Sequence, residues 1–274
     1  MLSFINILKL FSNNSDYESS IPECPYYECE GIRITAKYGH IEDKLNAIVN
    51  APKFKNWAKN IKRDKIKINE FIVTDVDFFG PINPSKLGFV KGYGIISDAR
   101  TGDKIVSNIA FIRGGSVAVL IIVTIKETKE KRIILCKQIR FPTGDELIEA
   151  CAGMLDDQVE DAEIEGVIFK ELREEAGFDV KVCDLIYLGK IIPSGGACDE
   201  VIECRAWETS ITQSEYNTKM NTLFGDKNES IQLKSFPFDT FDEVLNKIGD
   251  VKAECCWRRY LRYKSHCADT YDSE

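Results

Sequence analysis

Three glutamates near the middle of the chain are spaced so that their carboxylates would share one side of a helix. Glu171, Glu174 and Glu175 stand at positions i, i+3 and i+4, which lie on the same face of a helical backbone. Like charges at this spacing destabilise a helix by roughly 0.2–0.5 kcal/mol per pair. The arrangement therefore favours a bound divalent cation that would offset the repulsion. The alternative is an exposed acidic face, balanced by Lys170 and Arg173.

The composition removes several other kinds of site. Histidine occurs only at positions 40 and 266, so we expect carboxylates rather than a Ser/His/Asp or Cys/His system to supply acid and base groups. The 10 cysteines lack the paired spacing of a structural zinc site, and we predict free thiols in a reducing compartment. The net charge of −8 argues against a nucleic-acid partner. No apolar run reaches the roughly 18 residues that a membrane span needs.

The residues before the three glutamates predict the element that positions them. Ile164, Val167, Ile168 and Leu172 recur at helical spacing and form an apolar stripe. Gly177 is placed to end this helix. We therefore expect a helix that packs one face on a sheet and carries the glutamates in its last turns.

Strand-like runs on both sides of this helix predict two sheets. The apolar run SVAVLIIVTI from Ser116 and the run RIILCKQIRF from Arg132 form a hairpin at the centre of the main domain. Before it, EFIVTDVDFF, LGFVKGYGIISD and KIVSNIAFI, which start at Glu70, Leu87 and Lys104, predict a small antiparallel sheet. After the acidic helix come further strand-like runs and two closing helices. The predicted fold class is α+β, with a mixed sheet in an α/β/α sandwich.

Four parts follow from this reading of the chain. Residues 1–40 have weak periodicity and form a poorly ordered N-terminal segment. Residues 41–112 are expected to form a helical and β extension, and residues 113–265 the main domain. Residues 266–274 are expected to be a disordered tail.

The acidic stretch resembles the Nudix box, a pattern of Gly, five residues, Glu and seven residues before Arg-Glu-aliphatic-any-Glu-Glu-any-Gly-aliphatic. Its second half stands here as KELREEAGF, residues 170–178. The first half begins at Gly153, three residues farther away than in the general pattern. This spacing, together with GMLDD after it, is similar to that of plant-type Nudix hydrolases of ADP-sugars and related nucleotide sugars. The resemblance implies the Nudix form of the α/β/α sandwich.

Other motifs extend the resemblance from about Phe54 to about Tyr260. They occur in the same order as in that branch and are GGSVAVLI, QIRFPTG and PSGGACDE. Two positions depart from the family pattern. Lys170 replaces an arginine that braces the acidic helix, so the paired contact of a guanidinium is lost, and Cys151 stands where the branch usually has proline.

The resemblance implies a metal site and a general base. Glu171 and Glu175 would ligate Mg²⁺, with Mn²⁺ as an alternative, Glu174 would assist both metal binding and catalysis, and the carbonyl of Ala152 would complete the shell. Oxygen ligands of this kind suit hard cations, and water activated by the metal would attack phosphorus. The resemblance places the general base at Glu229. Asp226 is the fallback.

The resemblance also implies that the extension over residues 41–112 serves dimerisation and the substrate pocket, and it implies further residues for the substrate. Arg140 resembles a phosphate-facing arginine of the family, with a simple ion pair as the alternative. Gly195 and Gly196 would let the backbone approach a ligand closely. Glu200 would be a ligand or ribose contact, with solvation of a strand end as the alternative. Aromatic side chains that could stack on a base are those of Trp57, Phe78 and Phe79.

These implications lead to one leading function and two alternatives. The leading hypothesis is Mg²⁺-dependent hydrolysis of the diphosphate in a nucleoside diphosphate sugar, of the ADP-ribose, ADP-glucose or UDP-glucose type, by a cytoplasmic homodimer. Organelle targeting by the N-terminal segment stays open. One alternative keeps the chemistry but changes the substrate to a dinucleoside polyphosphate, a coenzyme or an RNA cap. The other is a Nudix module that binds a nucleotide without hydrolysing it.

Overall fold

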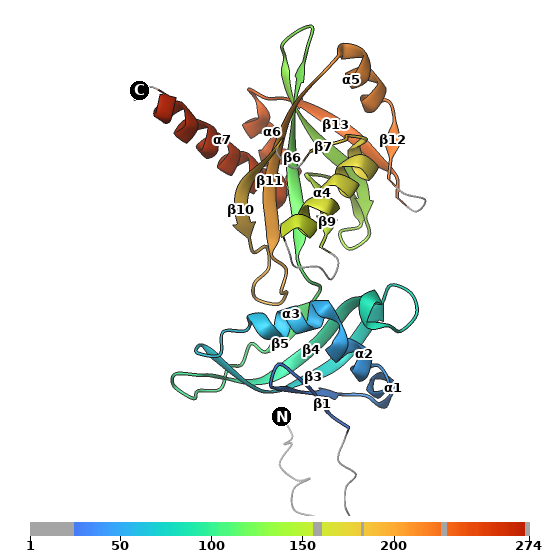
Figure 1. Ribbon diagram of the computed structural model, residues 1–274, viewed down its shortest axis with the longest axis vertical. Helices are drawn as coiled ribbons and strands as arrows, with labels where there is room; N and C mark the ends of the chain where they lie inside the picture. Colours follow the sequence, from blue (N-terminus) through green and yellow to red (C-terminus); the bar gives the residue numbers. More distant parts are fainter. Residues whose placement is uncertain (1–24, 156–160, 182–183, 226–228, 272–274) are drawn as a thin grey trace, which may run out of the picture.

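The computed structural model describes residues 25–155, 161–181, 184–225 and 229–271, which form two stacked parts (Figure 1). The first part contains a five-stranded sheet, and the second contains an eight-stranded sheet. The strands of the first sheet, in spatial order, are β1 (Tyr27–Cys29), β2 (Ile32–Ala36), β3 (Ile66–Phe78), β4 (Leu87–Asp98) and β5 (Ile109–Ile112). Between β2 and β3 lie three helices, α1 (Gly39–Glu42), α2 (Leu45–Asn50) and α3 (Pro52–Asn60). A 3₁₀ turn at Pro84–Lys86 precedes β4.

The first sheet is mixed, which corrects the prediction that it is antiparallel. β2 runs parallel to β3, with Ile34 opposite Phe71, whereas the other neighbouring pairs are antiparallel. Parallel neighbours need a long crossover connection. The helices α1 to α3 supply that connection, and their apolar side chains share a core with one face of the sheet.

The prediction of poor order over residues 1–40 is wrong for its last part. β1 and β2 lie within it, because Ile32 and Ile34 alternate with the exposed Arg33 and are fully buried. Residues 1–24 lie outside the described residues. The run from Lys104 is also a strand only in its last four residues, since Val106 is largely exposed and the pairing of β5 with β4 starts at Ile109.

The second sheet is mixed, as predicted for the main domain. Its main path runs in the order β10, β11, β6, β7, β13, β12, while β8 pairs with β7 and β9 pairs with β6. The bounds of these strands are β6 (Ser116–Ile125), β7 (Lys131–Arg140), β8 (Asp145–Glu149), β9 (Cys151–Met154), β10 (Leu185–Ile191), β11 (Ile202–Ile211), β12 (Leu223–Phe224) and β13 (Ile231–Pro237). The central strand β6 is buried along nearly its whole length. It runs parallel to β11 and antiparallel to β7 and β9.

Helices cover both faces of this sheet and complete the α/β/α sandwich. The helices α4 (Asp161–Ala176) and α5 (Gln213–Met220) pack on one face, and α6 (Phe241–Ile248) and α7 (Val251–Tyr271) pack on the other. The expected disordered tail from residue 266 is corrected by α7. Trp257 and Tyr260 anchor its first half in the core, and each further helical residue then adds one hydrogen bond. Residues 272–274 lie outside the described residues. Among the described helices, none combines the length and the apolar character that crossing a membrane requires.

The predicted packing and end of the acidic helix are confirmed. Ile164, Ile168 and Leu172 of α4 are buried against the sheet. Gly177 has a φ of 65°, in the left-handed region that glycine adopts without strain. The Gly177 N–H donates to the Arg173 carbonyl at 3.1 Å, which is the five-to-one bond of an αL cap, and the Phe178 N–H donates to the Leu172 carbonyl at 3.0 Å. The last turn, with its glutamates, is therefore fixed relative to the sheet.

Substitution of Gly92 tests the packing of the first sheet. A Cβ atom at Gly92 of β4 would lie 2.5 Å from the Phe71 ring and 2.6 Å from the Ile72 carbonyl oxygen. Gly92→Ala should therefore lower the free energy of unfolding by about 1–3 kcal/mol, measured by urea denaturation. Gly166→Ala is the matched control, because Gly166 lies in α4 with nothing within 4 Å of its added Cβ. The control should raise stability by about 0.4–1 kcal/mol, and equal effects of the two changes would contradict this packing.

Candidate active site

The last turns of α4 place the three glutamates at different depths, with Glu171 and Glu175 against β9. The side chain of Glu174 is 45% exposed, Glu171 is partly buried, and Glu175 is buried. A Cβ atom at Gly153 of β9 would lie 2.3 Å from Cγ of Glu171. Glycine is therefore required at position 153, because any larger residue would push the helix or the carboxylate away from the strand.

Glu175 is tied to the backbone of β9. Its Oε2 accepts a hydrogen bond from the Ala152 N–H at 3.2 Å. Ala152 stands opposite Ala118 of β6, and since its N–H points to Glu175, this is a pair without mutual hydrogen bonds. In antiparallel strands, the carbonyl of such a residue leaves from the same edge as its N–H. The Ala152 carbonyl thus points away from β6, toward the side on which Glu175 lies.

The clustered carboxylates disfavour one another's charged form. Burial, followed by the charges of Glu175, Glu174 and Glu229, raises the pKa of Glu171 to about 7, although the charge of Lys170 opposes this rise. Burial is also the main reason why the pKa of Glu175 is raised. The donors gathered here are carboxylate and carbonyl oxygens, which are the ligands that Mg²⁺ and Mn²⁺ prefer. The chemistry of this donor set fits a hard divalent cation.

Arg140, at the end of β7, lies beside this cluster in a buried ion-pair network. Its Nε donates to Glu149 at 2.6 Å, and the Lys252 ammonium contacts the other oxygen of Glu149 at 2.8 Å. Although burial opposes ionisation, Lys252 and Arg140 keep the pKa of Glu149 below its ordinary value. The ion pair considered as an alternative for Arg140 is thus present. The charges of Glu175 and Glu229 also contribute to the raised pKa of Arg140.

The sequence analysis missed Glu149 and Lys252. The sequence did show an acidic residue, Glu149, at the end of a strand that leads into the acidic stretch. It did not show the partners of Glu149, because Lys252 lies far away in the chain. Lys252 belongs to α7, on the opposite face of the sheet from α4. Pairing of this kind depends on the fold and leaves no pattern of local spacing.

Glu229 is exposed and lies within electrostatic reach of the acidic cluster. Its charge acts on Glu171, Glu175 and Arg140. Gly225, four positions earlier in the chain, is joined to α4, because its N–H donates to the Glu174 carbonyl at 2.9 Å. Asp226, the fallback base, lies outside the described residues.

Gly195, Gly196 and Glu200 lie on the other side of the main domain, near the first sheet. The two glycines help to line a cavity of about 530 Å³ between the β10–β11 connection and the first sheet. Glu200 accepts a hydrogen bond from Ser116 at 2.7 Å and pairs with Arg113 at 3.0 Å. The residues between them join the two parts of the molecule, because the Phe111 N–H donates to the Ala197 carbonyl at 2.7 Å. Gly195, Gly196 and Glu200 are not among the neighbours of the α4 carboxylates described above.

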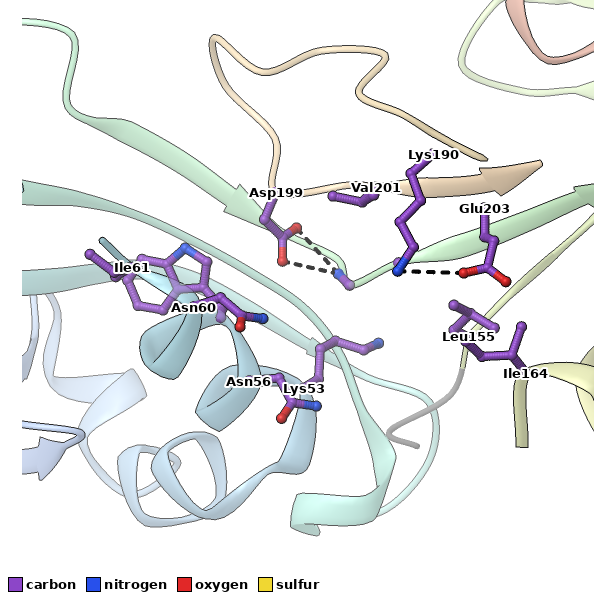
Figure 2. A pocket seen from close by; sticks show the side chains of 13 residues that line it. Lys53, Asn56, Asn60, Ile61, Leu155, Ile164, Lys190, Asp199, Val201 and Glu203 are labelled. Atoms are coloured by element: carbon purple, nitrogen blue, oxygen red, sulfur yellow. Dashed lines mark hydrogen bonds and ion pairs between the residues drawn. The ribbon is translucent and has the colours of Figure 1, made fainter. Parts of the chain in front are cut away.

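A second cavity, of about 370 Å³, lies between α3 and the main domain (Figure 2). Trp57 lines both cavities and packs on Phe54 and Phe71. The polar side chains that line the second cavity are Lys53, Asn56, Asn60, Lys190, Asp199 and Glu203. Ile164 of α4 also lines it, two helical turns before Glu171, so about 10 Å along the helix axis separates this wall from the carboxylates.

The other two aromatic candidates lie at one end of the first sheet. Phe79 is 53% exposed, and Phe78 is partly buried. Phe79 packs edge to face on Phe89. Neither residue is among those that line the two cavities.

Comparisons with known proteins identify the family. No family model matches the chain. It is 28% identical over 262 residues to the chloroplastic Nudix hydrolase 14 of Arabidopsis thaliana, covering 89% of this chain and 81% of that protein. It is 31% identical over 146 residues to the GDP-mannose pyrophosphatase of Escherichia coli K12, covering 51% of this chain and 68% of that protein. The chain belongs to the Nudix hydrolase family, and the resemblance based on its acidic helix is confirmed.

The solved structures include one of an ADP compounds hydrolase that aligns with a TM-score of 0.46 at 16% identity. The alignment covers 72% of this chain and 97% of the ADP compounds hydrolase chain.

Stability as a function of pH tests the charge of the cluster. Because the pKa of Glu171 rises from an ordinary 4.5 to about 7, the folded state holds this proton more tightly than the unfolded state. The metal-free protein should therefore lose stability as the pH rises from about 4.5 to about 7, with no further loss from this group above that. Partial exposure limits the effect to on the order of 1 kcal/mol.

Denaturation curves from pH 4 to pH 9 measure this loss. Glu171→Gln should remove most of the slope, whereas Glu243→Gln on α6 makes the same chemical change on another helix and should keep it. An unchanged slope in Glu171→Gln would show that the carboxylate is not perturbed.

Proposed function

We propose that the protein hydrolyses the diphosphate of nucleoside diphosphate sugars to a nucleoside monophosphate and a sugar phosphate, with Mg²⁺ or Mn²⁺ as cofactor. The observation that carries the proposal is the convergence of Glu171 and Glu175 on the glycine-containing strand β9, with the charge of Glu174 close enough to act on Glu171. The relative named a GDP-mannose pyrophosphatase supports a substrate of this class. The retained box supports hydrolysis rather than nucleotide binding alone.

We assign the metal to the oxygen atoms of the acidic cluster. Glu171, Glu175 and the Ala152 carbonyl would hold it, with Glu174 beside them. When bound, the metal supplies positive charge that neutralises the diphosphate and activates water. The Ala152 N–H orients Glu175 through the bond to its Oε2, which is the kind of supporting contact that fixes a ligand's position. Lys170, which contacts Glu174 at 3.8 Å and is 62% exposed, restrains the cluster only weakly.

Glu229 and Arg140 are assigned to proton transfer and to phosphate binding. Glu229 is exposed and close enough to influence the cluster, so it could accept a proton from water above the carboxylates. Arg140 carries its charge at the same edge, with Nε held by Glu149. Fixing one nitrogen of a guanidinium orients the whole planar group. Glu149 and Lys252 are thereby positioning residues for Arg140.

The cavities at the junction supply a place for the parts of the substrate that do not react. Gly195 and Gly196 permit close approach of a ligand to the backbone at the larger cavity. Glu200, held by Ser116 and Arg113, stands two residues from Cys198 of that cavity. The smaller cavity offers an indole ring and several amide and charged groups, a combination suited to a sugar or a base. The separation of about 10 Å along α4 can be spanned by a nucleotide sugar.

A homodimer and a cytoplasmic location complete the proposal. The helices α1 to α3 cover one face of the first sheet, whereas the side chains of Ile95, Ile109 and Phe111 are exposed. Exposed apolar side chains on neighbouring strands suit contact with a second copy. The Arabidopsis relative is named as a chloroplastic protein, which supports the alternative of organelle targeting. Sedimentation at micromolar concentration measures the oligomeric state, and a monomer there would contradict the dimer.

Turnover by cluster variants tests the proposed chemistry. Glu175→Gln should lower kcat on ADP-ribose by at least about 100-fold, because the amide cannot supply the same negative charge to a cation. Glu229→Gln should lower kcat by about 10²–10⁴-fold if it is the base. Glu165→Gln, on the same helix before the cluster, serves as the control. Circular dichroism verifies folding, and full turnover by folded Glu175→Gln would overturn the assignment.

A substrate panel separates the leading function from its alternatives. ADP-ribose, ADP-glucose, UDP-glucose, GDP-mannose, a dinucleoside polyphosphate, a coenzyme and a capped RNA are assayed with Mg²⁺, and the products are identified. The highest kcat/KM should fall on a nucleoside diphosphate sugar. Preference for one of the last three would change the substrate class. Tight binding without hydrolysis of any of them would favour the binding module.

A further inference from the structure

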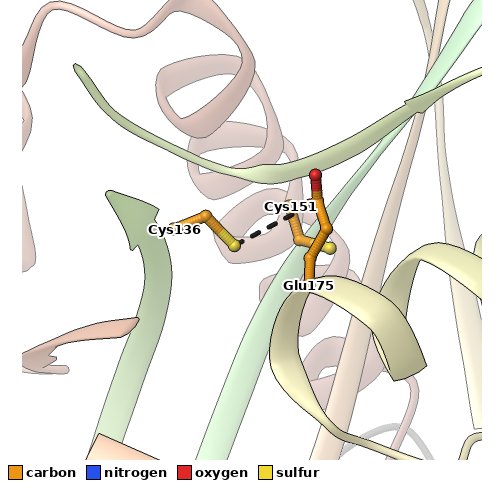
Figure 3. A group of neighbouring side chains, drawn as sticks. All are labelled: Cys136, Cys151 and Glu175. Carbon is orange, nitrogen blue, oxygen red and sulfur yellow. Dashed lines mark hydrogen bonds between the residues drawn. The ribbon is translucent and has the colours of Figure 1, made fainter. Parts of the chain in front are cut away.

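Beneath the acidic cluster, the structure brings together three side chains whose ligand atoms differ in kind from the oxygens above. Cys136 comes from β7, Cys151 from β9 and Glu175 from α4 (Figure 3). The two Sγ atoms and a carboxylate oxygen of Glu175 all lie within 4.8 Å of one another, and all three residues are buried. From this convergence we propose that Cys136, Cys151 and Glu175 form a second metal site, for a thiophilic divalent cation such as Zn²⁺ or Cd²⁺.

The sheet topology explains why residues from separate strands meet here. β6 pairs with β9 along its first half, at Ser116–Val119, and with β7 along its second half, at Ile121–Thr124. β9 and β7 therefore lie one after the other along β6. Cys136 and Cys151 both belong to the core layer under α4, so their thiols lie on the same face of the sheet. Glu175 extends from α4 toward these two thiols.

The donor set suits a soft or borderline cation. Zinc is bound by thiolate and carboxylate ligands in tetrahedral geometry, with Zn–S bonds of about 2.3 Å, which places two sulfur ligands about 3.7 Å apart. The observed limit of 4.8 Å requires only a small closure. Three protein ligands leave a fourth position for water or another oxygen. Magnesium, in contrast, avoids thiolates.

Binding requires that the two thiols lose their protons. The Cys136 thiol donates a hydrogen bond to Oε2 of Glu175 at 3.8 Å. The cation would replace both protons, so that one M²⁺, two thiols and one carboxylate give one bound metal and two released protons. The negative charge of the resulting thiolates is then met by the metal rather than left in the core.

A route to this site is provided by the acidic cluster. Glu174 is exposed and Glu171 is partly exposed, so a cation reaches the protein first through these carboxylates. Glu175 belongs to both sets of ligands and connects the upper oxygen site with the thiols below. A thiophilic cation would draw Glu175 away from the upper set. We therefore expect inhibition, a consequence that rests on the proposed function, whereas the binding itself does not.

A second buried thiol pair provides a matched control. Cys204 of β11 and Cys256 of α7 lie in the core layer on the opposite face of the sheet. In the part of the chain that the structure describes, only the trio with Glu175 gathers three such ligand atoms within the stated distance. Both pairs are buried as small apolar residues. Among the described residues, only the pair of Cys136 and Cys151 has a carboxylate oxygen within 4.8 Å.

Cadmium titration of the metal-stripped, full-length protein tests the site. The thiolate-to-cadmium charge-transfer absorption should saturate at one Cd²⁺ per chain and should persist in excess Mg²⁺. Cys136→Ala and Cys151→Ala should each lower the affinity by at least about 100-fold. Cys204→Ala should retain the band. If an alanine variant does not fold, Cys136→Ser or Cys151→Ser replaces it, because serine keeps the size but is a poor ligand for a soft cation.

The outcomes separate this site from the proposed enzyme activity. No band in the wild-type protein, or an equal band in the Cys136 and Cys151 variants, would overturn the metal site even if nucleotide sugars are hydrolysed. A band that depends on both cysteines supports the site even if no tested nucleotide is a substrate. Where turnover is measurable, stoichiometric Cd²⁺ should inhibit the wild type at least about tenfold more strongly than Cys151→Ala, each relative to its own activity without Cd²⁺.

Discussion

Repulsion between carboxylates that the fold holds together is the interaction on which this molecule depends. Glu175 is buried at the base of the group, and Glu171 is pressed against the strand at a position where only glycine fits. This unfavourable arrangement persists because the packing of α4 on the sheet and the glycine cap at its end fix the position of the helix. The mutual repulsion of these carboxylates is the unfavourable energy that a bound divalent cation would offset.

Apart from the exposed contact of Lys170 with Glu174, opposite charge is supplied beside the carboxylates rather than among them. Arg140 and Lys252 both contact Glu149, so their positive charges are held in place by a buried anion. Breaking a buried network of this kind by removing one member is strongly destabilising. The network therefore fixes a cation near the acidic cluster without neutralising the cluster directly, which keeps the carboxylates available to a metal.

Under the proposed function, the two-part architecture places the chemistry and the recognition of the substrate in different parts of the molecule. The acidic cluster belongs wholly to the second sheet and its helix, whereas the cavities form where α3 and the first sheet meet the main domain. Asp199 illustrates the junction, since its N–H donates to the Phe111 carbonyl of β5 at 3.3 Å, while its carboxylate accepts hydrogen bonds from the Arg113 and Gly114 N–H groups at the start of the main domain. Variation of the first part can thus change the junction while the cluster stays intact.

The sequence by itself determined the acidic helix, its apolar stripe, most strands and the family, because these depend on local periodicity and on spacing within short segments. It did not reveal that β2 pairs parallel to β3, nor that residues 27–36 form strands, because strand pairing is a long-range choice. The partners of Glu149 and the meeting of Cys136 with Cys151 were also decided only by the tertiary structure. Contacts between side chains far apart in the chain depend on which strands share a face and on how a helix lies across them, and no local pattern encodes that placement.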